Sequence, residues 1–163
     1  MPFKYYGGVH PDYAKTASKT PVRTISPPSV VVLPMIQQIG APNKPIVSVG
    51  DTVKMGQLIG TNDAPVSAPV HASVSGKVIA VEPRRHMLGD MVMSVVIEND
   101  FQDTPCEDMK PLSEEQLKDP DAIIARIREA GVVGMGGAMF PTAFKIQGAR
   151  GKVDTVIING AEC

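Results

Sequence analysis

Tryptophan is absent from this chain of 163 residues, and aromatic residues make up only 4% of it. A surface that stacks nucleic-acid bases on aromatic rings is therefore not expected. The formal net charge is −1, so no excess of basic residues attracts nucleic acid or an anionic membrane. No apolar run approaches the ~18 residues of a membrane span, and the N-terminus lacks the apolar core of a signal peptide. We expect neither a nucleic-acid partner nor a direct membrane span.

Cysteine is also scarce. Cys106 and Cys163 are the only two in the chain. They form no disulfide framework and no metal-ligand spacing, which indicates a reducing compartment. The three histidines are scattered, and no metal site is expected in this chain.

Short strand patterns fill residues 29–100. The runs SVVVLPMI and MVMSVVIEND have the composition of strands, and Pro34 within the first indicates an edge strand or a bulge. Turn signals separate the runs, at Gly50, Gly56 and Gly76 among other places. This half is predicted to be a small all-β sandwich or barrel. Residues 1–28 show no period and are expected to form an extended arm packed over a neighbour.

Several side chains of the β half are expected to face its core. In ASVSGKVIAVEP, the alternation places Val74, Val78 and Ala80 inward. Most methionines are expected to fill the core as well, because this flexible side chain fits irregular gaps. They include Met35, Met55, Met91 and Met93.

A helical period replaces the strand period after a polar linker at 101–112. Ser113 and Gln116 form a capping box, and Asp119 precedes a proline at the first helical position. Gly131 suits the position after a helix C-terminus, where a left-handed backbone is common. A short helix over 141–148 and a buried strand over 153–158 are expected next. Residues 113–163 are therefore predicted to begin an α/β domain.

The glycine-rich stretch VGMGGAMFPTAFK, residues 133–145, has two interpretations. Bare backbone amides that open a helix suit a phosphate, and Lys145 follows them. Alternatively, the glycines form a structural turn. The stretch is neither GxGxxG after a strand nor a Walker A sequence, so spacing leaves both interpretations open.

The β half resembles the biotinyl and lipoyl domains. The residues that carry the resemblance are VGDTVKMGQLIG, the hairpin TNDAPVSAPVHA and SGKVIAVEP. The resemblance implies a barrel-sandwich hybrid. Carrier domains place a modifiable lysine at the hairpin tip, and this hairpin contains none. Without that amine no amide to biotin or lipoate forms, so a carrier function is excluded.

The second half resembles the flavoprotein subunit of respiratory complex I. VGMGGAMFPTAFK is similar to its Gly-x-Gly-Gly-Ala-Gly-Phe-Pro-Thr-x-x-Lys motif, and IINGAEC is similar to its Asn-Ala-Asp-Glu loop. Together with YYGGVHPDYAK, QQIGAPNKPIVSVGDTVKMGQ and the hairpin, these segments resemble the RnfC family of the Rnf complex. The resemblance extends from about residue 6 to residue 163. It implies an α+β multi-domain fold, a lipoyl-like barrel-sandwich hybrid followed by the start of a complex-I-flavoprotein-like α/β domain.

The resemblance also implies which residues contact FMN and NADH. Lys145 matches the lysine that meets the FMN phosphate, whereas Met139 stands where complex I has glycine and Ala161 where it has aspartate. No general acid or base is named, because hydride transfer needs none. The implied cofactor-binding residues are Gly134, Gly136, Gly137, Ala138, Phe140, Lys145, Asn159 and Glu162.

The implied function is electron transfer between NAD(H), FMN and iron–sulfur clusters in a membrane-bound, ion-translocating ferredoxin:NAD+ oxidoreductase. The two [4Fe-4S] clusters are expected in the full-length protein. This chain is expected to be its N-terminal portion, inactive alone. The implied partners are the other Rnf subunits, at the cytoplasmic side of the cell membrane. Two alternatives are a soluble RnfC-like electron-transfer protein that feeds a reductase, and a non-enzymatic docking scaffold.

Overall fold

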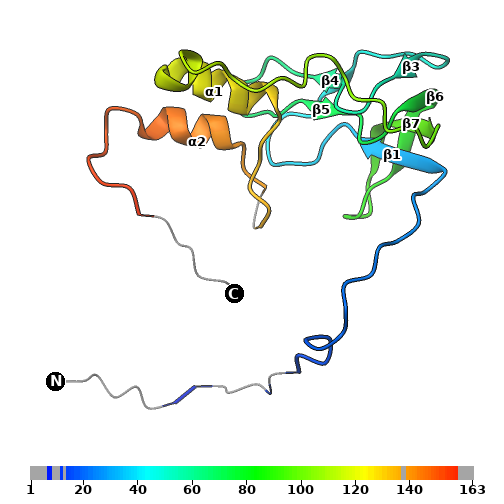
Figure 1. Cartoon of the computed structure of the whole chain (residues 1–163), viewed down its shortest axis with the longest axis horizontal. Helices are drawn as coiled ribbons and strands as arrows, with labels where there is room; N and C mark the ends of the chain where they lie inside the picture. Colours follow the sequence, from blue (N-terminus) through cyan, green and yellow to red (C-terminus); the bar gives the residue numbers. More distant parts are fainter. Residues whose placement is uncertain (1–6, 9–11, 13, 137–138, 158–163) are drawn as a thin grey trace.

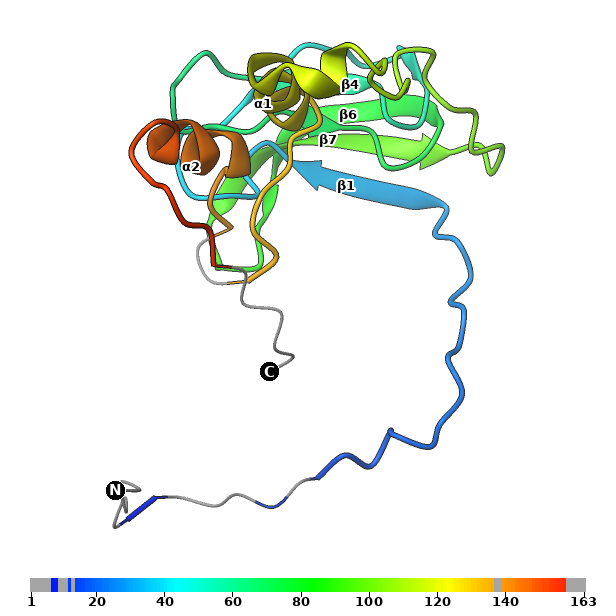
Figure 2. The same ribbon diagram turned by 60° about the vertical axis from the view of Figure 1, so that its left-hand side comes forward.

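The computed structural model describes residues 7, 8, 12, 14–136 and 139–157. Its β half consists of two antiparallel sheets (Figures 1 and 2). The larger sheet has the order β1-β7-β6-β3, and the smaller has the order β2-β4-β5. The strands are β1 (Val30–Pro34), β2 (Lys44–Pro45), β3 (Thr52–Val53), β4 (Leu58–Thr61), β5 (Val70–His71), β6 (Gly76–Arg85) and β7 (Met91–Asn99).

One hydrophobic core joins these sheets. Ile59 of β4 and Val78 of β6 are each 0% exposed, as is Ile97 of β7. β1 is an edge strand, so Pro34 costs the sheet no ladder hydrogen bond, as its position in the sequence predicts. The core residues are Met35, Val53, Ile59, Val70, Ala72, Val78, Val95 and Ile97.

A β-bulge in β6 corrects the predicted alternation. Val78 is buried and Val74 packs against the core, as expected. The register between β6 and β7 then shifts between Val78 and Ala80. The extra residue changes which side chain faces inward, so Val81 packs against the core in place of Ala80.

The prediction for the methionines is wrong at two positions. Met35 is 1% exposed, whereas Met91 is 63% and Met93 is 41% exposed. The ladder between β1 and β7 ends at the pair Pro34 and Ser94. Beyond this pair, the amide of Met35 still donates to the carbonyl of Met93 at 2.8 Å. β6 and β7 then continue as a two-stranded hairpin, so Met91 lies outside the region that a third strand reaches.

The helical half begins as the capping signals predict. The amide of Ser113 donates to Gln116 Oε1 at 3.0 Å, and the amide of Gln116 donates to Ser113 Oγ at 3.2 Å. This reciprocal pair begins the 3-10 helix η1 (Gln116–Lys118). Asp119 then caps α1 (Pro120–Glu129), because its carboxylate accepts from the amide of Asp121 at 2.9 Å.

The end of α1 is a Schellman turn. Gly131 has a φ of 66°, and its amide donates to the carbonyl of Arg128. The amide of Val132 donates to the carbonyl of Ile127. Glycine is favoured at this left-handed position, which confirms the predicted role of Gly131.

The second helix, α2 (Thr142–Ala149), packs against α1. Arg150 and Asp121 form an ion pair that joins the end of α2 to the start of α1. The strand predicted over 153–158 is absent from its described part, 153–157. Val156 is 79% and Ile157 90% exposed, because no described strand lies beside this segment to form a ladder with it.

The remaining segments flank the sheets. The described part of residues 14–28 extends away from the body of the protein (Figures 1 and 2), and Val22 is fully exposed. Residues 101–112 return along the barrel, where the amide of Cys106 donates to the carbonyl of Met55 at 2.8 Å. Within the described ranges, no helix is both long and apolar enough to cross a membrane.

Candidate functional site

The glycine-rich stretch forms a loop with a closed stem. Val133 and Pro141 form an antiparallel bridge. The amide of Gly134 donates to the carbonyl of Phe140, and the amide of Thr142 donates to the carbonyl of Val132, both at 3.0 Å. These bonds hold the start of the loop against the start of α2, so the position of one sets the position of the other.

Neither the backbone conformation nor crowding requires glycine at two positions of this loop. Gly134 and Gly136 both lie outside the left-handed region. Among the described residues, a Cβ built on Gly136 meets nothing within 4 Å, and a Cβ on Gly134 has its nearest neighbours at 3.7 Å, in ordinary contact. The described part of the loop would therefore accept alanine at both positions. The bare backbone leaves space in which a ligand could approach it closely.

Met139 has the strained backbone of the loop. Its φ is 49°, in the left-handed region, and its amide donates to the carbonyl of Gly136 at 3.3 Å. This conformation costs a residue with a side chain about 1–2 kcal/mol. The motif of the complex I flavoprotein, which this stretch resembles, has glycine at this position. Residue 139 therefore has a backbone conformation typical of glycine although it is methionine.

The N-terminus of α2 lies at the end of the loop. Pro141 precedes the helix, and no side chain of the described residues caps this end. The rings of Phe140 and Phe144 pack edge to face, with centroids 5.8 Å apart. Lys145 follows in the early part of the helix and is exposed. An uncapped helix N-terminus with a lysine beside it favours an anionic group.

The structure brings together four of the eight residues implied by the resemblance. Gly134, Gly136, Phe140 and Lys145 all lie on the loop or on α2. The bare backbone of the two glycines, the uncapped helix end and the lysine fit a planar ligand that carries a phosphate. The other four lie outside the described residues, as does Ala161: they are Gly137, Ala138, Asn159 and Glu162.

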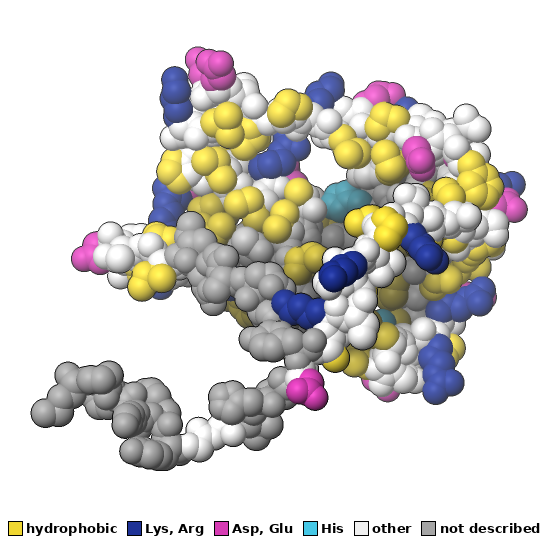
Figure 3. All heavy atoms as spheres, turned by 60° about the horizontal axis from the view of Figure 1, so that its bottom comes forward, with side chains coloured by type: hydrophobic (Ala, Val, Ile, Leu, Met, Phe, Trp, Pro, Cys, Tyr) yellow, Lys and Arg dark blue, Asp and Glu magenta, His cyan; other side chains and the backbone are white. Residues whose placement is uncertain are grey.

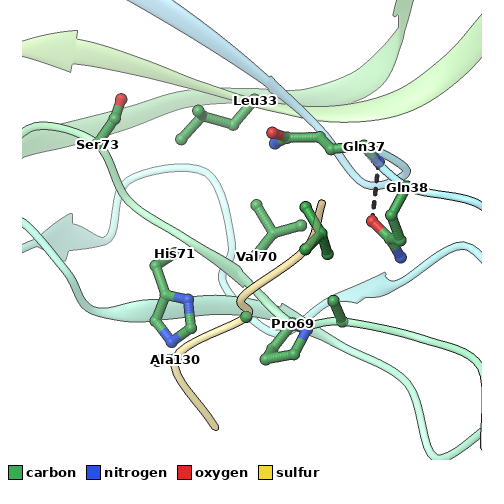
Figure 4. A pocket seen from close by; sticks show the side chains of 11 residues that line it. Leu33, Gln37, Gln38, Pro69, Val70, His71, Ser73 and Ala130 are labelled. Carbon is green, nitrogen blue, oxygen red and sulfur yellow. Dashed lines mark hydrogen bonds between the residues drawn. The ribbon is translucent and has the colours of Figure 1, made fainter. Parts of the chain in front are cut away.

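A cleft of about 240 Å³ lies between the β half and this loop (Figure 4). Its lining includes Pro69 and His71 from one side and Gly131 and Val133 from the other. Burial lowers the pKa of His71, which favours the neutral ring. The sequence gives no signal for this junction, because about 60 residues separate its two sides and no motif includes both. In the space-filling view, a histidine lies at the rim of a hollow on the face toward the viewer (Figure 3).

Two family models match the chain. Residues 3–102 match the family described as the RnfC barrel sandwich hybrid domain. Residues 127–163, which include the glycine-rich loop and α2, match the family described as the Nuo51 FMN-binding domain. The predicted barrel-sandwich hybrid, followed by the start of an FMN-domain-like unit, is confirmed.

Curated relatives match over nearly the whole chain. A subunit of the Na(+)-translocating ferredoxin:NAD(+) oxidoreductase complex of Acetobacterium woodii is 50% identical over 161 residues, which are 98% of this chain and 36% of the relative. Its counterpart in the proton-translocating complex of Clostridium ljungdahlii is 43% identical, with 98% of this chain and 35% of the relative covered. A subunit of the ion-translocating oxidoreductase complex of Klebsiella pneumoniae is 43% identical over 98% of this chain and 21% of its own length.

The chain thus spans about a third or less of the length of these relatives. The barrel-domain match covers more than half of it, and the matched residues form the two sheets of the structure. The chain belongs to the RnfC family.

Proposed function

We propose that this chain is the part of an RnfC subunit that positions FMN for electron transfer between NAD(H) and iron–sulfur clusters. The whole subunit would act in a membrane-bound, ion-translocating ferredoxin:NAD+ oxidoreductase, the activity that the names of two relatives state. The match to an FMN-binding domain over 127–163 supports the cofactor.

The observation that carries the proposal is the unforced glycine backbone of the loop. Gly134 and Gly136 are glycine where neither φ nor crowding demands it. A flat ring that lies against peptide amides does demand it, because a Cβ would hold the ring away.

The loop and α2 would hold different parts of FMN. Gly134, Gly136 and the ring of Phe140 would lie along the flavin, and Lys145 with the N-terminus of α2 would bind the phosphate. Gly137, Ala138, Asn159 and Glu162 are assigned to the flavin and the nicotinamide by the resemblance alone. When bound, FMN supplies the chemistry that accepts a hydride and releases single electrons. The chain's own residues would bind the flavin and orient it.

The remaining parts of the assembly are proposals for the whole protein. Two [4Fe-4S] clusters in the full-length protein would accept the electrons. The other Rnf subunits would be the partners, with peripheral attachment at the cytoplasmic side of the membrane.

A titration of the full-length protein with FMN tests the proposal, with flavin fluorescence as the readout. Gly136→Asp places a side chain and a negative charge in the open loop, and Gly148→Asp is the matched control. Gly148 is exposed on α2 and a Cβ there also meets nothing within 4 Å. We expect Gly136→Asp to weaken FMN binding at least tenfold while Gly148→Asp stays within about twofold of wild type. Equal affinities of the two variants would refute the site.

The same protein distinguishes the alternative functions. Wild-type protein that binds no FMN would favour a docking scaffold. FMN binding without co-purification of the other subunits would favour a soluble electron-transfer protein.

A further inference from the structure

We propose that the barrel hairpin, residues 61–72, is a fixed seat that sets the position of the glycine-rich loop, with Pro69 and His71 as positioning residues. This inference rests on the proposed function of the loop, and it assigns a role to a hairpin that has no modifiable lysine. Hydrogen bonds fix the hairpin to the barrel. The hairpin contacts the joint, which is the segment at Gly131 between α1 and the glycine-rich loop. Further hydrogen bonds link this joint to the loop.

Side-chain hydrogen bonds hold the hairpin in one shape. Ser67 is 7% exposed, and its hydroxyl donates to the carbonyl of Ala64 at 2.7 Å. Asn62 Oδ1 accepts from the amide of Ala64 at 2.6 Å, and Asn62 Nδ2 donates to the carbonyl of Pro42 at 2.7 Å. These bonds close the hairpin on itself and join it to the segment that precedes β2.

That segment, residues 37–43, pins the hairpin at further points. Asn43 is 4% exposed, and its Nδ2 donates to the carbonyl of Ala68 at 2.8 Å. The amide of Ala41 donates to the carbonyl of Val66 at 3.0 Å. At Gly40, a Cβ would lie 2.2 Å from that same carbonyl oxygen. Residues 37–43 (QQIGAPN) therefore lie directly against the hairpin. Their hydrogen bonds to it restrict its movement relative to the barrel.

The hairpin touches the joint between α1 and the glycine-rich loop. A Cβ built on Gly131 would lie 2.6 Å from the carbonyl oxygen of Pro69 and 3.6 Å from His71 Nδ1. The first distance is shorter than real contacts allow, so the two backbones meet there with no room for a side chain. Figure 4 shows the strand of the hairpin with Pro69, Val70 and His71 beside the segment that contains Ala130.

The joint is linked to the loop by consecutive bonds. Val132, next to Gly131, accepts from the amide of Thr142 at 3.0 Å. Val133 forms the bridge to Pro141. Gly134 then opens the loop. A displacement of Gly131 from the hairpin would therefore move both the glycine backbone of the loop and the N-terminus of α2.

Gly131→Ala in the full-length protein tests the seat, and Gly151→Ala is its matched control. Gly151 has a φ of +70°, close to the +66° of Gly131, but a Cβ on Gly151 meets no described residue within 4 Å. Both variants carry the same backbone strain, and only Gly131→Ala collides with the hairpin. The difference between them isolates the contact with Pro69.

Two readouts are measured on each variant. The first is hydrogen exchange of the amides of Gly134 and Thr142 without flavin, which we expect to be at least tenfold faster in Gly131→Ala than in Gly151→Ala. The second is the FMN affinity and the visible circular dichroism of the bound flavin. We expect affinity to fall at least tenfold and the flavin signal to change in Gly131→Ala, while exchange of β6 and β7 stays as in wild type.

Equal exchange and equal affinity in the two glycine variants would overturn the seat. Should the wild type bind no FMN, the proposed function fails, and the exchange readout alone decides on the seat. Should Gly131→Ala not fold, His71→Ala replaces it and His86→Ala, on the β6–β7 turn and not among the residues that line the cleft, is the control. We then expect about threefold faster exchange at Gly134 in His71→Ala alone, and no difference would refute the seat.

Discussion

The left-handed backbone at Met139 predicts an unusual order of stability among substitutions. With a φ of 49°, residue 139 suits glycine better than any residue with a Cβ. Met139→Gly and Met139→Ala both remove the long side chain, so the difference between them isolates the backbone. The left-handed conformation costs alanine about 1–2 kcal/mol, and glycine's greater freedom in the unfolded state offsets about 0.4–1 kcal/mol of that. Met139→Gly should therefore be more stable than Met139→Ala, by up to about 1.6 kcal/mol.

Met135 provides the opposite case in the same loop. It is fully exposed and does not have a positive φ. There alanine should be the more stable by about 0.4–1 kcal/mol, because only the unfolded-state entropy differs. Thermal unfolding followed by circular dichroism at the helical minimum is the assay, since all the described helices lie in this half. For a protein of this size, 1 kcal/mol shifts the midpoint by about 2–4 °C. The same order of alanine and glycine at both positions would refute the reasoning.

Three further predictions concern the core, a helix cap and a buried histidine. Ile97→Ala, at a fully buried position, should lower the free energy of unfolding by about 2–5 kcal/mol in urea, and Ile79→Ala, at a site 42% exposed, should cost much less. Asp119→Ala should cost about 1 kcal/mol, seen as a lower helical melting midpoint, because it removes the cap of α1; an unchanged midpoint would contradict that role. For His71, the folded pKa lies below the ordinary value of 6.5, so the unfolded state binds the proton more readily. Stability from the neutral ring is therefore present above that value and lost as the pH falls below it, and the melting midpoint between pH 7 and 5 should fall more in wild type than in His71→Gln.

Much of the fold could be predicted from local signals. Pro34 on an edge strand, the capping box at Ser113 and the left-handed Gly131 each depend on the chemistry of a few adjacent residues, and the structure has all three. Such signals need no knowledge of the partner segments, which explains their success.

The errors arose where distant segments decide the outcome. The bulge after Val78 depends on the register with β7, which alternation within one strand does not reveal. Met91 is exposed because β1 ends before reaching it, a fact about another strand. The strand expected over 153–158 lacks a neighbour in the described structure. In each case the local composition suited the prediction, but it could not show which element would cover the residues.

The site was predictable in part for the same reason. The loop glycines and Lys145 form a continuous motif, so the sequence alone identified them as candidate cofactor-binding residues. The contact of Gly131 with Pro69 joins two distant segments and gave no sequence signal. Nor could sequence show that Gly134 and Gly136 lie outside the left-handed region, the observation on which the proposed ligand site depends.

The most direct test of the proposed site is an experimental structure of the full-length protein with FMN bound. We expect the flavin ring against the peptide backbone at Gly134 and Gly136, and the phosphate at the N-terminus of α2 near Lys145. A structure in which side chains fill the space beside that backbone, and the flavin is bound elsewhere, would contradict the proposed site.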